Sequence, residues 1–219
     1  METTPFILSE FKAFTLQTKI AEIKHFFHET TFSHFPIVKN KQLIGLISET
    51  DVFGIDEEAA EIGNFQHLFN LFFVEENTNL LEILKEFASN ETNLIPVINT
   101  NKEYVGYYDL IDTLHTYNDT SFLKNEGTIL TIEKKLKDFS FSQVCQIVES
   151  NNGKVLGLFV LESNAEKVKL IIKFSSQDIN EIIQSFRRFN YSVISKHKDD
   201  FYLEDLKERS NYLQKYLNI

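Results

Sequence analysis

Two stretches of this 219-residue sequence decide its fold: SHFPIVKNKQLIGLISETDV at residues 33–52 and NLIPVINTNKEYVGYYDLIDTL at residues 93–114. In each stretch an apolar segment contains a proline, a polar turn follows, and a second apolar segment contains a glycine. The segment FPIV at 35–38 is matched by IPVI at 95–98, at an offset of 60 residues. Related segments at one fixed offset indicate that one structural unit is used twice.

The second apolar segments, LIGLI at 43–47 and YVGYY at 104–108, are offset by 61 residues, so one residue has been added in the preceding turn. Turns tolerate insertions better than strands do. A helix is expected before each stretch, because apolar residues recur at helical spacing, as at Ile20, Ile23 and Phe27. Each unit is thus predicted to run helix, strand, turn, strand, helix.

These motifs resemble the CBS domain, a family that usually occurs as a tandem pair called a Bateman module. The resemblance rests on the proline-centred strand, the hydrophobic-Gly-hydrophobic strand, and an aspartate six residues after each glycine, Asp51 and Asp112. It covers residues 1–122, which we divide into repeat 1 (1–62) and repeat 2 (63–122). A duplicated α+β unit of another family is the alternative.

The resemblance implies a ligand site between paired repeats, where the family holds adenosine-type molecules such as AMP, ATP or S-adenosylmethionine. By the family's pattern Thr50 and Asp51 of repeat 1 would hold the ribose, with Ser48 beside them. The backbone around Phe35 and Pro36 would meet the adenine edge. An equally favoured interpretation is structural, since Ser48, Thr50 and Asp51 all suit the start of a helix.

Repeat 2 departs from this pattern. It keeps Asp112, but Ile111 stands at the hydroxyl position and Asp109 replaces Ser48. An added carboxylate and a missing hydroxyl both oppose a phosphorylated ligand, so this second site is expected to be empty or structural. Phosphate recognition needs cations, yet Glu49 lies inside the first motif. The available cations near the two motifs are His34, Lys39, Lys41 and His115.

From about residue 127 the pattern changes. The strand candidates are residues 128–133, 155–161, 167–174 and 191–195. Helical spacing predicts one helix after the first strand and another after the third, the latter capped by Asp178. The third strand alternates strictly, with lysines such as Lys173 on a face expected to be wet. The resulting order, βαββαβ, is ferredoxin-like.

A ferredoxin-like unit after a CBS pair resembles the ACT domain, and the whole chain is similar to the CBS-ACT proteins typified by the acetoin-utilisation regulatory protein. We assign residues 123–198 to this ACT-like domain and 199–219 to a C-terminal helix. The resemblance implies amino-acid binding at a glycine-containing loop after the first strand. Because residues 134–140 contain no glycine, we expect a pairing module instead.

Composition limits the partners and the chemistry. Thirty-two Asp and Glu against 22 Lys and Arg give a net charge of −10, which disfavours nucleic acid and anionic membranes. No apolar run approaches the roughly 18 residues of a membrane span, and the chain starts without a basic leader. A single cysteine, Cys145, excludes an internal disulfide framework. These features predict a cytoplasmic protein.

No catalytic motif stands out in the sequence. His25 and His28 share a helix face, but no third metal ligand accompanies them. We therefore expect no catalytic residues, no metal and no required cofactor.

The tail predicts self-association. Leu203, Leu206, Leu213 and Leu217 follow Asp199 and Asp200 and form a narrow stripe along a predicted helix. The helix either packs back on its own domain or packs across a two-fold axis in a homodimer.

The sequence as a whole predicts a non-catalytic regulatory protein. Its CBS pair would sense an adenosine-type ligand, and its ACT-like domain would relay that state to a protein partner or a sister subunit. A ligand-free dimerisation and protein-interaction scaffold is the alternative.

Overall fold

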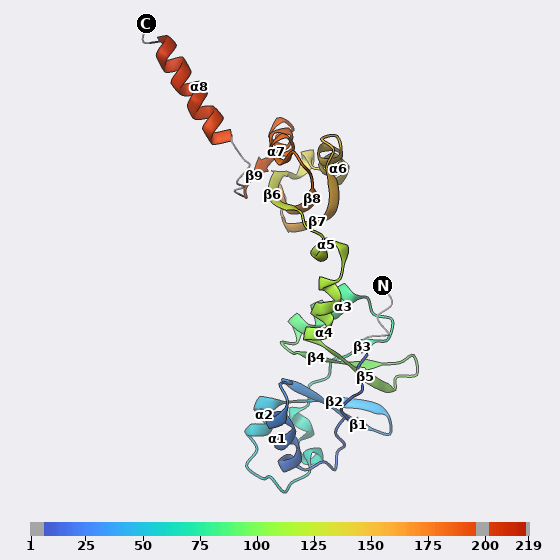
Figure 1. Ribbon diagram of the computed structural model, residues 1–219. Coiled ribbons are helices and arrows are strands. Elements are labelled where there is room, and N and C mark those ends of the chain that lie inside the picture. The colour runs from blue at the N-terminus through green and yellow to red at the C-terminus, as the bar shows by residue number, and fades with distance from the viewer. Residues whose placement is uncertain (1–6, 196–201, 218–219) are drawn as a thin grey trace. The chain divides into compact units, whose positions relative to one another are not determined.

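The computed structural model describes residues 7–195 and 202–217 (Figure 1). The chain divides into two compact units, residues 1–118 and 119–219. The predicted start of the ACT-like domain at residue 123 lies within the second unit, and its predicted end at 198 lies outside the described residues. Each unit mixes helices with strands and has its own apolar core.

Repeat 1 has the predicted order of elements. They are α1 (Ile20–Glu29), β1 (His34–Lys39), β2 (Gln42–Ser48) and α2 (Glu49–Phe53). The apolar stripe of α1 is buried, as its spacing predicts, through Ile20, Ile23 and Phe27. Strands β1 and β2 pair in antiparallel fashion across the polar turn.

Repeat 2 begins with a short 3-10 helix and a short strand and then has the same order of elements. The elements are η2 (Ile62–Leu68), β3 (Val74–Glu75), α3 (Leu80–Ser89), β4 (Leu94–Ile98), β5 (Tyr104–Asp109) and α4 (Leu110–Asn118). Strand β3 runs parallel to β4, which pairs antiparallel with β5. In repeat 1 the position of β3 is taken by Phe14, whose N–H donates to the Pro36 carbonyl at 2.9 Å.

The segment at the start of each repeat pairs with the other repeat. Leu8, ahead of α1 in repeat 1, exchanges two backbone hydrogen bonds of 2.8 and 2.9 Å with Tyr107 of β5. Asn70, ahead of α3 in repeat 2, exchanges two of 2.7 and 2.9 Å with Leu46 of β2. The two repeats are therefore exchanged at their leading segments, which ties them into one unit.

The glycine of each motif makes room for this exchange. A Cβ at Gly45 would lie 2.9 Å from the Cβ of Phe69, and a Cβ at Gly106 would overlap the carbonyl oxygen of Leu8. Only glycine lets another backbone come so close. The hydrophobic-Gly-hydrophobic pattern thus has a packing cause in both repeats.

Equivalent residues of the two repeats meet each other. The backbone N–H of Ser33 donates to Asn93 Oδ1 at 2.8 Å, and that of Asn93 donates to Ser33 Oγ at 3.2 Å. Gln42 forms an antiparallel bridge with Glu103. Contacts between residues separated by one repeat length mark an approximate two-fold axis within the first unit.

The second unit contains a four-stranded antiparallel sheet with the predicted βαββαβ order. Its elements are α5 (Ser121–Lys124), β6 (Thr128–Lys135), η3 (Leu136–Asp138), α6 (Phe141–Glu149), β7 (Lys154–Ser163), β8 (Lys167–Ser175), α7 (Ile179–Arg188) and β9 (Ser192–Val193). The strand order is β7-β8-β6-β9, which is the ferredoxin-like arrangement. Asp178 caps α7 as predicted, accepting from the Glu181 N–H at 3.1 Å.

The face of the sheet that carries the β8 lysines was predicted to be exposed to water. For Lys173 this prediction was wrong. Lys173 is only 7% exposed, and its ammonium donates to the carbonyls of Phe122 at 2.6 Å and Leu123 at 3.3 Å. The Phe122 ring lies against Gly157 and meets the Phe159 ring edge-on at 4.8 Å. Helix α5 therefore covers part of this face, and its carbonyls satisfy the buried lysine.

The predicted C-terminal helix is present as α8 (Tyr202–Leu217). Its described apolar side chains, Tyr212, Leu213, Tyr216 and Leu217, are 59–82% exposed. Asp199 and Asp200, and the predicted boundary beside them, lie outside the described residues. Among the helices that the structure describes, none has the length and apolar character needed to cross a bilayer.

Candidate functional site

The polar residues predicted for the repeat 1 site gather where β2 ends and α2 begins. Ser48 is the N-cap of α2: its Oγ accepts from the Asp51 N–H at 3.0 Å and donates to Asp51 Oδ2 at 2.6 Å. Thr50, in the first turn, is exposed. The capping interpretation of Ser48 is therefore confirmed. Asp51 Oδ1 has no donor among the described residues, so it can still accept a hydrogen bond.

Phe35 and Pro36 lie in the core beside this corner. The Phe35 side chain is 0% exposed and the residue pairs with Ile47 of β2. Pro36 has no N–H, and its carbonyl already accepts from Phe14. Contact of these two residues with an adenine stays a prediction, and the Pro36 backbone offers it no unused donor.

His34 also belongs to this corner. Burial lowers its pKa, and the nearby Asp51 carboxylate opposes that effect only in part. Its Nδ1 lies 3.0 Å from Ser33 Oγ, and its ring meets Phe72 edge-on. A lowered pKa favours the neutral imidazole at pH 7, so His34 does not supply the positive charge that its residue type suggested.

The equivalent corner of repeat 2 is more acidic. Asp109 takes the place of Ser48 as the cap, and its Oδ1 accepts from the N–H groups of Ile111 at 2.8 Å and Asp112 at 3.1 Å. The pKa of the Tyr107 hydroxyl is raised, first by burial and then by the carboxylates of Glu10, Asp109 and Asp112. Several carboxylates at one corner oppose a phosphorylated ligand there.

The other predicted cations, Lys39, Lys41 and His115, are all exposed, and His115 lies one turn after Asp112 on α4. Lys41 lies in the exposed turn of repeat 1, with its Nζ 3.8 Å from Glu103 Oε1. Within the described ranges, no three His, Cys, Asp or Glu side chains are placed to hold a metal ion.

Comparison with protein families identifies the repeats. The CBS domain model matches residues 6–58 and 67–118, so the first unit contains tandem CBS domains. Tandem CBS domains are generally regulatory modules. The comparison with curated proteins gives no match.

Solved structures with similar folds cover about half of the chain. A CBS domain pair/ACT domain protein from Thermotoga maritima is 18% identical, with 53% of this chain and 96% of that one covered and a TM-score of 0.48. The CBS domains of a transcriptional regulator from Streptococcus pneumoniae are 15% identical (52% and 98% covered, TM-score 0.46). CBSX2 in complex with AMP is 14% identical (53% and 95% covered, TM-score 0.46).

Proposed function

We propose that this protein is a non-catalytic regulator whose CBS pair senses an adenosine-type ligand at the repeat 1 corner. The observation that carries this proposal is the Asp51 carboxylate. One of its oxygens is anchored by Ser48, the other accepts no hydrogen bond from the described residues, and the preceding residue, Thr50, is exposed. A carboxylate accepts hydrogen bonds from a ribose diol, and a hydroxyl can donate or accept.

The charges at this corner select among adenosine ligands. His34 is held toward its neutral form by burial, and Glu49 adds a negative charge to the motif. Multiply charged phosphates would therefore meet little compensation there. The proposal therefore favours S-adenosylmethionine, which carries no phosphate, over AMP, and AMP over ATP. CBSX2, a protein of similar fold, was solved with AMP.

The second unit would relay the ligand state. Its ferredoxin-like strand order supports an ACT-like pairing module, in an arrangement like that of the acetoin-utilisation CBS-ACT proteins. The relay would pass to a sister subunit or a partner protein in the cytoplasm.

A thermal melt with AMP, ATP and S-adenosylmethionine tests the ligand site. A ligand at one hundred times its Kd should add about 2.7 kcal/mol to the free energy of unfolding. Thr50→Ala/Asp51→Ala should lose this gain. The matched control Ile111→Ala/Asp112→Ala changes the equivalent positions of repeat 2 and should keep it. No gain with any of the three ligands, or an equal gain in Thr50→Ala/Asp51→Ala, rejects the site.

A ligand-free scaffold is the second candidate, because the described apolar side chains of α8 are exposed. In this function α8 packs against α8 of a second subunit across a two-fold axis, and the CBS repeats present a surface to a protein partner without binding a ligand. Light scattering on the full chain and on a truncation after Lys198 tests it. A monomeric full chain rejects the homodimer, and an unchanged dimer after truncation rejects the role of α8. Nucleotide released from the purified protein on heating would count against a ligand-free function.

A further inference from the structure

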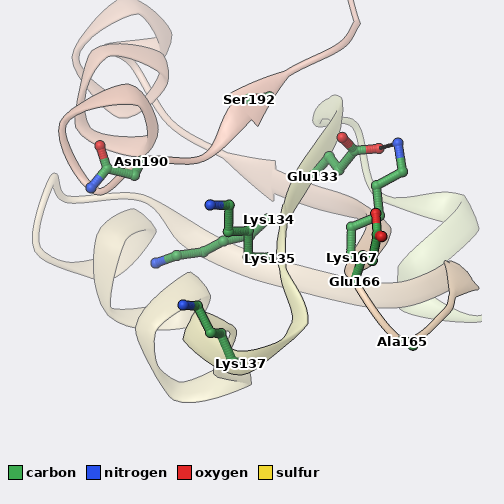
Figure 2. A pocket seen from close by; sticks show the side chains of 9 residues that line it. All are labelled: Glu133, Lys134, Lys135, Lys137, Ala165, Glu166, Lys167, Asn190 and Ser192. Atoms are coloured by element: carbon green, nitrogen blue, oxygen red, sulfur yellow. Dashed lines mark ion pairs between the residues drawn. The ribbon is translucent and has the colours of Figure 1, made fainter.

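A pocket of about 690 Å³ opens at one end of the sheet in the second unit (Figure 2). Its walls come from three places: the end of β6 with η3, the turn between β7 and β8, and the residues at the start of β9. Four lysines and two glutamates are among the lining residues. The volume lies in the range of small-molecule sites, roughly 300–1,000 Å³.

One pair of these charges cancels. Lys167 Nζ lies 2.8 Å from Glu133 Oε2, and this hydrogen bond raises the pKa of Lys167. In Figure 2 the pair points away from the ammonium groups of the other three lysines. It closes one side of the pocket without adding net charge.

Lys134 is held in place without being neutralised. Its Nζ donates to Gln143 Oε1 at 2.6 Å and lies 4.3 Å from the centre of the Tyr191 ring. The Tyr191 hydroxyl donates to the same Gln143 oxygen at 3.1 Å, which fixes the amide. Both partners of Lys134 are uncharged, so a positioned ammonium keeps its full charge at the pocket.

Lys135 and Lys137 add two further positive charges. Both side chains are exposed, and neither forms an ion pair with any residue that the structure describes. In Figure 2 their ammonium groups and that of Lys134 point toward the side of Asn190. Among the described lining residues, Glu166, exposed on the turn between β7 and β8, is the one carboxylate left to oppose them. Positive charge is therefore concentrated here in a chain of net charge −10.

We propose that this pocket binds a small anion that carries a phosphate group. Clustered ammonium groups repel one another, and a bound anion relieves that repulsion. Lysine binds phosphate as a point charge, whereas the bidentate capture of a planar carboxylate is typical of arginine, and no arginine is among the lining residues that the structure describes. The Asn190 amide adds a neutral donor at the same side. This site is separate from the repeat 1 corner and does not depend on the adenosine proposal.

Isothermal titration of the full chain at constant ionic strength tests this site, with pyrophosphate and glucose 6-phosphate as probes. Saturable binding is expected, weakened about tenfold or more in Lys135→Gln/Lys137→Gln because two charge-assisted contacts are lost. The control Lys12→Gln/Lys85→Gln removes the same charge from two exposed lysines of the first unit and should leave affinity unchanged. The tighter of the two probes distinguishes an inorganic polyphosphate from a phosphate ester.

Three outcomes overturn the proposal. They are no saturable binding of either probe, equal weakening in both double variants, and tighter binding of a glutamate-rich peptide than of either probe. Circular dichroism melts establish that each variant is folded. Thr50→Ala/Asp51→Ala should bind pyrophosphate as the parent does, which separates failure of this site from failure of the adenosine site.

Discussion

The two repeats share one fold and differ at one corner. In repeat 1 the helix after the glycine strand is capped by Ser48, which also donates to Asp51. In repeat 2 the equivalent helix is capped by Asp109, and Ile111 stands at the position that Thr50 has in repeat 1. Either side chain satisfies the cap, because both present an oxygen to the free N–H groups of the first turn.

This difference separates what the fold needs from what a ligand needs. The fold needs an oxygen at the cap and a glycine where the other repeat's leading segment passes, and both repeats have them. A ribose would need an open carboxylate and a nearby hydroxyl, and only repeat 1 has the pair Thr50 and Asp51. The ligand proposal therefore rests on one repeat.

The largest expected effect concerns the exchanged leading segments. Gly106→Ala should lower the free energy of unfolding by about 3 kcal/mol, because its Cβ would overlap the Leu8 carbonyl, which cannot move without breaking its backbone pairing. Gly45→Ala should cost less, about 2 kcal/mol, since its Cβ would lie 2.9 Å from the Phe69 Cβ and 3.1 Å from the Asn70 carbonyl oxygen, which is a less severe overlap. Urea unfolding measures both. Gly54→Ala is the control, because its Cβ would come no closer than 3.3 Å to the atoms around it, and a Gly106→Ala midpoint equal to that of the control contradicts the argument.

The contact on the approximate two-fold axis comes next. Asn93→Ala should cost about 1.5 kcal/mol, because it leaves the half-buried N–H of Ser33 and the exposed Thr31 carbonyl without their amide partners. Ser33→Ala should cost less, about 1 kcal/mol, since it removes one hydroxyl. Urea unfolding measures both losses of stability from the shift in midpoint, provided that the slope of the free energy against urea concentration is unchanged. A larger loss of unfolding free energy for Ser33→Ala than for Asn93→Ala would contradict the view that the Asn93 side chain contributes more than Ser33 to this contact between the repeats.

The two N-caps, Ser48 and Asp109, should contribute equally to the free energy of unfolding. Ser48→Ala and Asp109→Ala should each cost about 1 kcal/mol, the usual loss of an N-cap. Asp109→Ser should recover most of that loss, because a hydroxyl also caps. Thermal melts of the three variants measure this, and a failure of Asp109→Ser to recover stability would show that the carboxylate does more than cap the helix.

The smallest effect is a pH dependence specific to repeat 1. The pKa of His34 is lower in the folded protein than its ordinary value of 6.5, so the unfolded chain binds the proton more readily. Stability should be full above about pH 6.5 and fall as pH drops toward the folded pKa. His34→Leu, which copies Leu94 of repeat 2, should flatten this slope. Urea midpoints at about pH 7.5 and 5.5 measure it, and an unchanged slope in the variant assigns it to other groups.

Local patterns in the sequence predicted the elements and part of the site. The fixed offset predicted the duplication, and helical and alternating spacings predicted the main helices and strands of both units, but not β3, α5 or the 3-10 helices η2 and η3. The polar run at Ser48 and Asp51 predicted a helix start, which is where both residues lie. These features depend on neighbours a few residues apart, which the sequence displays directly.

Long-range packing decided the rest. The exchange of leading segments, the burial of Lys173 under α5 and the neutral tendency of His34 all depend on residues far away in the chain. The sequence by itself therefore determined the duplicated units, the order of their elements along the chain, and the caps at Ser48 and Asp178. Only the tertiary structure decided which backbone passes each glycine and which lysines gather at one pocket, because burial and electrostatic environment are set by contacts between distant segments.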